Sequence, residues 1–391
     1  MKKSVKQDIA KLNKHFGWNY SINEFKVFMK GLTSKNYLVV FMQGSNSRNC
    51  TQKLSEDFIE EFREDINWYD VSKYQKLSDK FILKFSGKVV WYYIVQFQKL
   101  NESLIEHLIA CGHISLLDVI KYQNVSEDFL RKNFDKIDFN IVTYRALSED
   151  FMREFADELN WDSIASYQKL SESFIEEFAS RVDWRAIVKY QKLSESFIEK
   201  NLYHYCFGCF DLILKYQKFS EDFMRRLIGV IALFLFRYNY TIGRYQKLSE
   251  EFRKEFNIKV PENNWLYTSK EDKLKYIKEN TNYEIIDDEY IIAYKSVRSD
   301  RYSVFNFQYQ YLDGETYESH CDCNNDDDNS FGLSAWTINN AIVYYSQGKI
   351  LKVKIAIDKI GAIVNPNQKI RCFELTVIGE VDDHGNLCPK E

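Results

Sequence analysis

The sequence predicts a mainly α-helical protein, an α-solenoid of about nine two-helix repeats of ~23 residues followed by a small α+β domain. A segment of the form Tyr-Gln-Lys-Leu-Ser-Glu-x-Phe recurs at nearly constant spacing, and β-rich runs replace the helical pattern after residue 284. All three prolines, Pro261, Pro366 and Pro389, lie outside the repeats. This is expected of a continuous run of short helices, which a proline would break.

The second position of the recurring segment fixes the register of the repeats. It falls at Gln52, Gln75, Gln98, Gln123, Arg145, Gln168, Gln191, Gln217 and Gln246. Similarity at a fixed period indicates stacked units that bury their apolar sides against one another. We therefore predict an N-terminal cap region over 1–49, a repeat array over 50–258, a linker and helix over 259–284, and an α+β domain over 285–391.

One repeat illustrates the local physics. Ser171 can cap a helix, and Glu172 follows in the first turn, where negative charge suits the helix dipole. Phe174 and its apolar neighbours then share one face of a first helix, helix A. Asp183 can cap a shorter helix B that begins at Trp184. Helices below ~12 residues are marginal alone, so each repeat must pack on its neighbours.

The repeated polar and aromatic residues are interpreted as architecture. The glutamines, Gln75, Gln98, Gln168 and Gln191 among them, are expected to bind carbonyl groups at the end of helix B or in the next repeat. Four tryptophans, Trp68, Trp91, Trp161 and Trp184, precede the aromatic residue of the Tyr-Gln pair by six positions. We expect them and the repeated tyrosines in the core rather than in a row that stacks on ligands, and the repeated glutamates on a solvated face.

Composition excludes several classes of function. A net charge of −4 gives no basic field for nucleic acid or an anionic membrane. No apolar run approaches the ~20 residues of a membrane-spanning helix, and no signal peptide follows Met1. The eight cysteines are therefore expected to be reduced, in a cytoplasmic protein.

The C-terminal region changes from helical to β pattern. Strands are predicted at 290–295, 349–357 and 371–377, with helices over 270–279 and from Thr337 to Tyr344. Such a mixture predicts a small α+β domain.

Two clusters resemble metal-binding spacings. His320, Cys321 and Cys323 precede acidic residues at 326–328, but zinc normally requires Cys pairs two to four residues apart. We favour a polar surface loop and predict no metal. His204, Cys206 and Cys209 have the Cys-x₂-Cys spacing but fall where helix A joins helix B, so ordinary packing is favoured.

The repeat over 51–256 resembles that of uncharacterised proteins of giant DNA viruses of the mimivirus type. The stretches 293–298, 332–336 and 369–372 resemble a small domain that recurs at the ends of such proteins. This resemblance implies a viral origin, with the host cytoplasm or the virion as location, and it assigns no particular activity to either part.

A second resemblance concerns ADP-ribosyltransferase-like domains, which act on NAD. It aligns Lys295 with the residue that the family carries on its first strand, and Ser334 or Trp336 with the residue on its second strand. Glu374 or Glu380 would correspond to the glutamate that the family carries late in the domain. The family uses Arg or His where Lys295 stands, and its Gln-x-Glu or Glu-x-Glu motif is absent.

Two functions follow as hypotheses. The preferred one is a non-enzymatic scaffold without cofactor that binds a protein partner through the solenoid surface. The alternative is an ADP-ribosyltransferase-like enzyme whose repeats serve as a targeting module.

Overall fold

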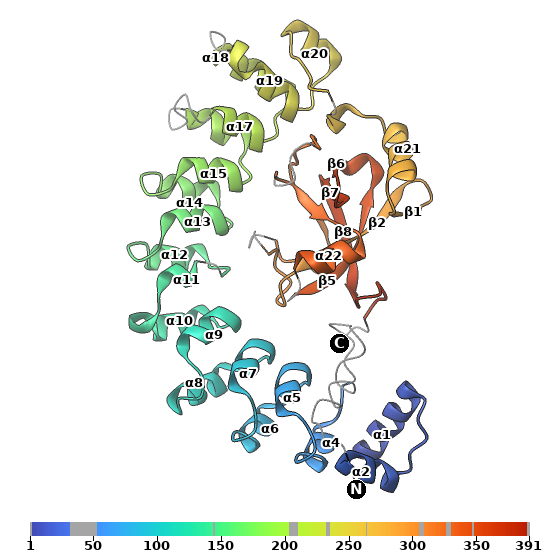
Figure 1. The fold of residues 1–391 in the computed structure, drawn as a ribbon. Coiled ribbons are helices and arrows are strands. Elements are labelled where there is room, and N and C mark those ends of the chain that lie inside the picture. Colours follow the sequence, from blue (N-terminus) through green and yellow to red (C-terminus); the bar gives the residue numbers. More distant parts are fainter. Residues whose placement is uncertain are drawn as a thin grey trace. The chain divides into compact units, whose positions relative to one another are not determined.

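The computed structural model describes residues 2–31, 53–143, 145–202, 210–231, 235–262, 264–304, 309–325, 330–345 and 348–388 (Figure 1). Contacts between Cα atoms divide the chain into two compact units, Met1–Val142 and Thr143–Glu391. The boundary lies beside Arg145, which stands where the other repeats have glutamine. The segment 37–42 and the cluster of His204, Cys206 and Cys209 lie outside the described residues.

The first unit begins with two helices that precede the repeats, α1 (Lys3–Phe16) and α2 (Ile22–Gly31). The A helices that follow are α4 (Glu56–Glu61), α6 (Asp79–Lys84), α8 (Glu102–Ala110) and α10 (Glu127–Lys132). The B helices are α5 (Trp68–Tyr74), α7 (Trp91–Phe97), α9 (Leu116–Tyr122) and α11 (Phe139–Val142).

The second unit continues the alternation before it enters the C-terminal domain. Its A helices are α12 (Glu149–Glu154), α14 (Glu172–Glu177), α16 (Glu195–Lys200), α18 (Glu221–Val230) and α20 (Glu250–Glu255). Its B helices are α13 (Trp161–Tyr167), α15 (Trp184–Tyr190), α17 (Phe210–Tyr216) and α19 (Leu235–Tyr245). The predicted fold class, helical repeats followed by a small α+β domain, is confirmed.

A serine cap and a buried apolar pair define most of the A helices. In α14 the hydroxyl of Ser171 accepts a hydrogen bond from the backbone N–H of Phe174 at 3.1 Å. Phe174 and Ile175 are fully buried. Such a helix of about two turns cannot stand alone, so its stability comes from packing against the neighbouring repeats.

The C-terminal domain contains two antiparallel sheets. The larger has the order β1-β2-β5-β8-β3, with β1 (Glu284–Ile286), β2 (Tyr290–Val297), β5 (Lys349–Ala356), β8 (Glu374–Val381) and β3 (Thr316–Glu318). The smaller has the order β4-β7-β6, with β4 (Leu333–Ala335), β7 (Lys369–Cys372) and β6 (Ile360–Val364). The single strand predicted over 371–377 is therefore wrong, because the chain leaves one sheet and enters the other at Phe373.

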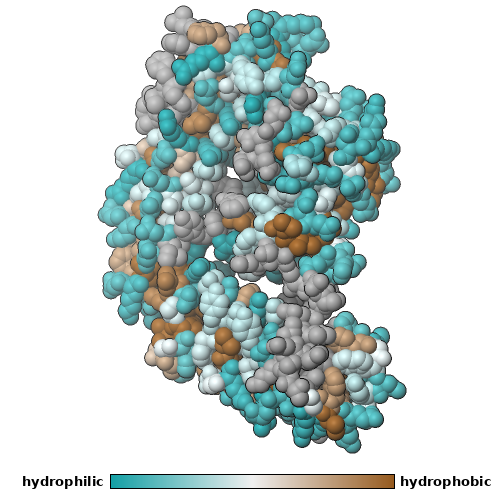
Figure 2. All heavy atoms as spheres, in the orientation of Figure 1, coloured by the Kyte–Doolittle hydropathy of each residue, from teal (hydrophilic) through white to brown (hydrophobic). Residues whose placement is uncertain are grey.

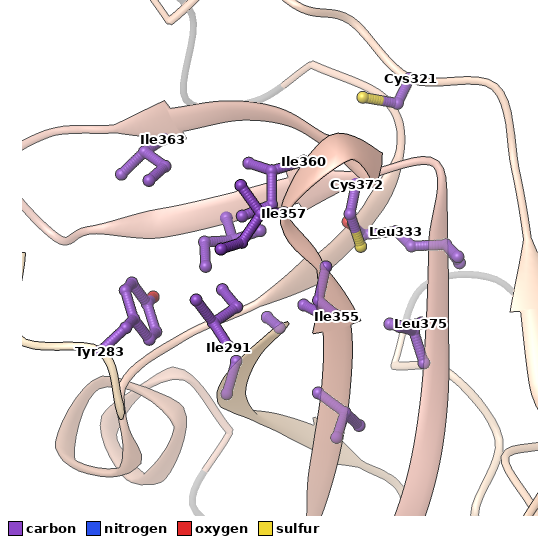
Figure 3. Packing of buried hydrophobic residues seen from close by; sticks show 14 of the residues in the cluster. Tyr283, Ile291, Cys321, Leu333, Ile355, Ile357, Ile360, Ile363, Cys372 and Leu375 are labelled. Atoms are coloured by element: carbon purple, nitrogen blue, oxygen red, sulfur yellow. The ribbon is translucent and has the colours of Figure 1, made fainter. Parts of the chain in front are cut away.

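The core of this domain lies between the two sheets. Figure 3 shows Ile291, Ile355 and Leu375 of the larger sheet near Leu333 and Cys372 of the smaller one. Three of these side chains are fully buried, and Leu333 and Leu375 are nearly so. Alternate residues of β2, β5, β7 and β8 supply this face, as the period of two in a β-strand requires.

Helices cover the rest of the domain. The 3₁₀ turn Trp265–Tyr267 and helix α21 (Lys270–Asn280) contribute Trp265, Leu266 and Ile277 to the core, so this part of the predicted linker segment packs in the domain. Helix α22 (Ile338–Tyr344) covers another face of the larger sheet, where Ala341 packs with Ile350.

Hydrophilic residues cover most of the surface seen in Figure 2, and hydrophobic residues form separate patches on it. Within the described ranges, no helix has both the length and the apolar character needed to cross a bilayer.

Candidate functional site

The repeated glutamines join successive repeats. The Oε1 atom of Gln191 accepts from the N–H of Leu170 at 3.0 Å, and its Nε2 atom donates to the carbonyl groups of Ala165 and Gln168 at 2.9 and 2.7 Å. The same three-bond pattern recurs at Gln98, Gln123, Gln168, Gln217 and Gln246. Gln75 accepts from the N–H of Leu54. These bonds leave the glutamine amides committed to the architecture.

The first glutamate of each A helix joins repeats in a second way. The carboxylate of Glu172 accepts hydrogen bonds from the N–H and the hydroxyl of Ser194 in the next repeat, at 2.5 and 3.0 Å. The same pairing links Glu56 to Ser78, Glu102 to Ser126, Glu149 to Ser171, Glu195 to Ser220 and Glu221 to Ser249. These glutamates are half-buried. They therefore differ from the solvated face that the sequence predicted.

Residues outside the repeats complete both sets of bonds. At the N-terminal end, Asp8 of α1 accepts from the N–H and the hydroxyl of Ser55, as a repeat glutamate would. At the other end, the hydroxyl of Tyr267 accepts from the N–H of Leu248 at 3.3 Å and donates to the carbonyl of Gln246 at 2.7 Å. Tyr267 thus replaces the glutamine of a missing repeat.

The tryptophans pack between repeats at half-buried positions. The indole N–H of Trp161 donates to the carbonyl of Ala156 at 2.9 Å, and its ring lies 4.6 Å from that of Phe178. Trp68 and Trp184 make the corresponding hydrogen bonds. Trp91 instead stacks on His113 at 4.4 Å. All four contact other rings, but none is fully buried as a core residue would be.

The lysines and aromatic residues next to the buried glutamines in the sequence are more exposed than the glutamines themselves. In the first unit, rings of successive B helices form a continuous cluster that we call the aromatic patch, made of Tyr69, Tyr92, Tyr93, Phe97 and Tyr122. Tyr92 and Phe97 are 52% and 40% exposed. The ammonium group of Lys73 lies 5.5 Å from the centre of the Phe97 ring. This patch is aromatic, partly exposed and flanked by positive charge.

In the second unit the corresponding lysines line a cleft of about 1110 Å³. We call five of them the lysine ridge: Lys189, Lys192, Lys215, Lys218 and Lys247. The C-terminal domain supplies five more lysines to the same walls: Lys270, Lys273, Lys295, Lys359 and Lys369. Among the described residues of these walls, only Glu318, Asp358 and Glu374 carry carboxylates. The cleft is therefore strongly basic, although the chain as a whole is acidic.

Direct contacts hold the two walls of the cleft together. The guanidinium group of Arg244 in α19 lies 3.1 Å from the fully buried carboxylate of Asp322. Burial alone would raise the pKa of Asp322, but hydrogen bonds from Ser330 and Arg244 hold it below its usual value. The ring of Phe331 lies 4.7 Å from that of Tyr216. The cleft is therefore formed before any ligand binds.

Of the residues that the ADP-ribosyltransferase resemblance singles out, Lys295, Ser334, Trp336 and Glu374 line this cleft, and Glu380 does not. The ammonium group of Lys295, on the inner face of β2, donates to the carbonyl of Ser334 at 2.8 Å, and burial lowers the pKa of Lys295 to about 8. Trp336 is stacked on Tyr344 at 4.2 Å. The carboxylate of Glu374 lies 3.9 Å from the ammonium group of Lys359. The structure thus brings Lys295 and Ser334 together through a backbone oxygen.

The polar surface loop predicted around His320, Cys321 and Cys323 is wrong, because both cysteines lie in the core of the domain. Cys321 and Cys323 are buried, and burial raises the pKa of the Cys321 thiol, which disfavours the thiolate that binds zinc. Burial, together with the nearby ammonium group of Lys218, lowers the pKa of His320 to about 4. Among the described residues, no group of three His, Cys, Asp or Glu side chains could hold a metal ion. The acidic residues 326–328 lie outside that set.

The sequence contains one pattern that relates to the cleft, a recurring lysine. This lysine directly follows the second position of the recurring segment in seven of its nine copies. Its recurrence predicts a row of charge, but only the fold places the C-terminal domain against that row. The chain was also compared with protein-family models, curated proteins and solved structures, and it matches none of them.

Proposed function

We propose that the protein is a non-enzymatic scaffold that binds a protein partner through the surface of its repeats. The observation that carries this proposal is the aromatic patch. Tyr69, Tyr92 and Phe97 of the patch stay exposed, whereas the glutamines, serines and glutamates of the same repeats form the bonds that join one repeat to the next. Aromatic residues are enriched at protein interfaces because they bury a large area with few rotatable bonds.

The chemistry of the patch favours a partner segment with both apolar and acidic side chains. Tyr92 and Phe97 offer apolar area, and the ammonium groups of Lys73 and Lys121 lie over neighbouring rings. An acidic side chain on the partner would meet these lysines at the rim, where charge mainly guides association and specificity. In line with the viral resemblance, we place this interaction in the host cytoplasm or the virion.

The test uses the full chain as bait, and then the purified partner. The double variant Tyr92→Ser/Phe97→Ser removes the exposed centre of the patch. A matched control, Val230→Ser/Val343→Ser, removes apolar side chains that are 63% and 81% exposed elsewhere. We expect the patch variant to weaken binding by ~2 kcal/mol or more, the scale of interface hot spots, and the control to bind like wild type. Equal binding by all three proteins would refute the proposal.

A catalytic alternative rests on one observation, that Lys295, Ser334, Trp336 and Glu374 line the same cleft. It predicts that the full chain consumes NAD and that Glu374→Gln abolishes this activity. Glu380 is the matched control, because its carboxylate binds Lys349 at 2.8 Å and is not among the residues that line the cleft. Wild-type protein that leaves NAD intact at millimolar concentration would exclude this alternative.

A further inference from the structure

We infer that the basic cleft of the second unit binds an extended acidic peptide segment, supplied by the protein partner. This inference rests on the proposed scaffold function and adds a second contact of defined chemistry to it.

The charge of the lysine ridge points to an acidic ligand. Lysines on the A helices pair with acids of the preceding repeat, as Lys84 does with Glu60 and Lys200 with Glu176. Among the described residues, none of the five ridge lysines forms an ion pair. Lys192 and Lys218 are exposed and follow successive glutamines along one wall. Positive charge held in a concave wall attracts a ligand of the opposite sign.

The aromatic rings and the type of cation in the cleft favour an acidic peptide over a single-stranded nucleic acid. Nucleic-acid grooves combine positive charge with open aromatic faces on which bases stack. Here Phe331 and the ammonium group of Lys215 lie against the ring of Tyr216. Trp336 is stacked on Tyr344. The described residues of the cleft lining also include no arginine, the residue best suited to bidentate phosphate recognition.

The size and the layout of the cleft fit an extended chain. At about 1110 Å³ the cleft exceeds the ~300–1,000 Å³ typical of small-molecule sites. Lys192, Lys218 and Lys247 occupy the same position in three successive repeats, so their charges form a row rather than a cluster. A row of single positive charges matches carboxylates distributed along an extended chain.

Not every lysine of the cleft takes part. The ammonium group of Lys273 donates to the carbonyl of Ile360 at 2.6 Å, and that of Lys295 to the carbonyl of Ser334. Lys270 pairs with Glu289. The acidic segment therefore contacts mainly the lysine ridge, and substitutions there report on binding without disturbing the core of the domain.

The experiment measures binding of a fluorescein-labelled peptide of alternating Glu and Gly to the full chain by fluorescence anisotropy, at low and at physiological salt. The cleft variant is Lys192→Glu/Lys218→Glu. The matched control is Lys99→Glu/Lys169→Glu, which changes the same repeat position by the same charge at exposed residues that do not line the cleft. A labelled oligo-dT strand of similar length provides the second arm.

We expect the peptide to bind wild type and the control equally well, with an affinity that falls as the salt concentration rises. The cleft variant should bind it about tenfold more weakly, because each charge reversal replaces attraction by repulsion. Equal binding to the cleft variant and the control would overturn the inference, as would tighter binding of oligo-dT than of the peptide. If the cleft variant does not fold, Lys192→Gln/Lys218→Gln replaces it. If the patch variant no longer binds the partner but the acidic peptide does not bind wild type, the inference about the cleft is refuted and the proposed scaffold function is not.

Discussion

Gln191→Met tests whether the glutamine amides hold the repeats together. Methionine keeps the length and apolar stem of glutamine and has a similar helix propensity, but it lacks the amide. Gln191 is 4% exposed and makes three hydrogen bonds to backbone groups of the preceding repeat, at 2.7–3.0 Å. The substitution therefore leaves the N–H of Leu170 and two carbonyl groups without this partner.

The magnitude follows from those three bonds. Each contributes about 1 kcal/mol net, and a buried group left unsatisfied costs about 1–3 kcal/mol. We therefore expect Gln191→Met to lower the free energy of unfolding by about 3 kcal/mol. The control is Gln7→Met on the exposed face of α1, where a change within ~0.5 kcal/mol is expected.

Urea unfolding followed by circular dichroism measures the total effect, and amide hydrogen exchange locates it. The exchange measurement matters because repeat arrays can unfold in parts rather than in one step. We expect the amide of Leu170 to lose protection in Gln191→Met and to keep it in Gln7→Met. Unchanged stability together with unchanged protection of the Leu170 amide would refute the claim that the glutamine amides hold the repeats together.

Three further outcomes are expected. Tyr267→Phe removes the hydroxyl that replaces the next glutamine, so urea unfolding should show a loss of ~1–2 kcal/mol. Ser194→Ala removes both a helix cap and a bond to Glu172, and should cost a similar ~1–2 kcal/mol in the same assay. The folded-state pKa of Lys295 is lowered from 10.5 to about 8, so the unfolded chain binds more protons between these values. The free energy of unfolding should therefore rise with pH across that window by about 3 kcal/mol at most, and Lys295→Met should lack the rise when unfolding is measured from pH 7 to 11.

The repeats were predictable because their interactions are themselves periodic. The bond from Leu170 to Gln191 joins residues 21 apart, and that from Leu193 to Gln217 joins residues 24 apart. Every repeat must supply the same partners at nearly the same separation, so the fold imprints a visible period on the sequence. The roles of the glutamate and the lysine were harder to separate, because both look like solvent-facing charges until the helices are placed.

The cleft could not be predicted because non-repeating contacts form it. The ion pair between Arg244 and Asp322 joins residues 78 apart, far more than the 21 to 32 residues that separate partners in the repeat pattern. Net charge also averages over the whole chain, so a value of −4 does not reveal ten lysines on one surface. The division of the predicted strand at Phe373 had a similar cause, because a change of sheet leaves the local apolar pattern almost unbroken.

Hydrogen–deuterium exchange of the full chain, with and without its purified partner, tests the central claim most directly. If the repeats form a scaffold that binds through its surface lysines and aromatic residues, exchange should slow in 91–97 and 116–122, around the aromatic patch. It should also slow in 189–193 and 215–218, along the lysine ridge. Protection confined to the A helices, or to β-strands away from the cleft, would contradict the account.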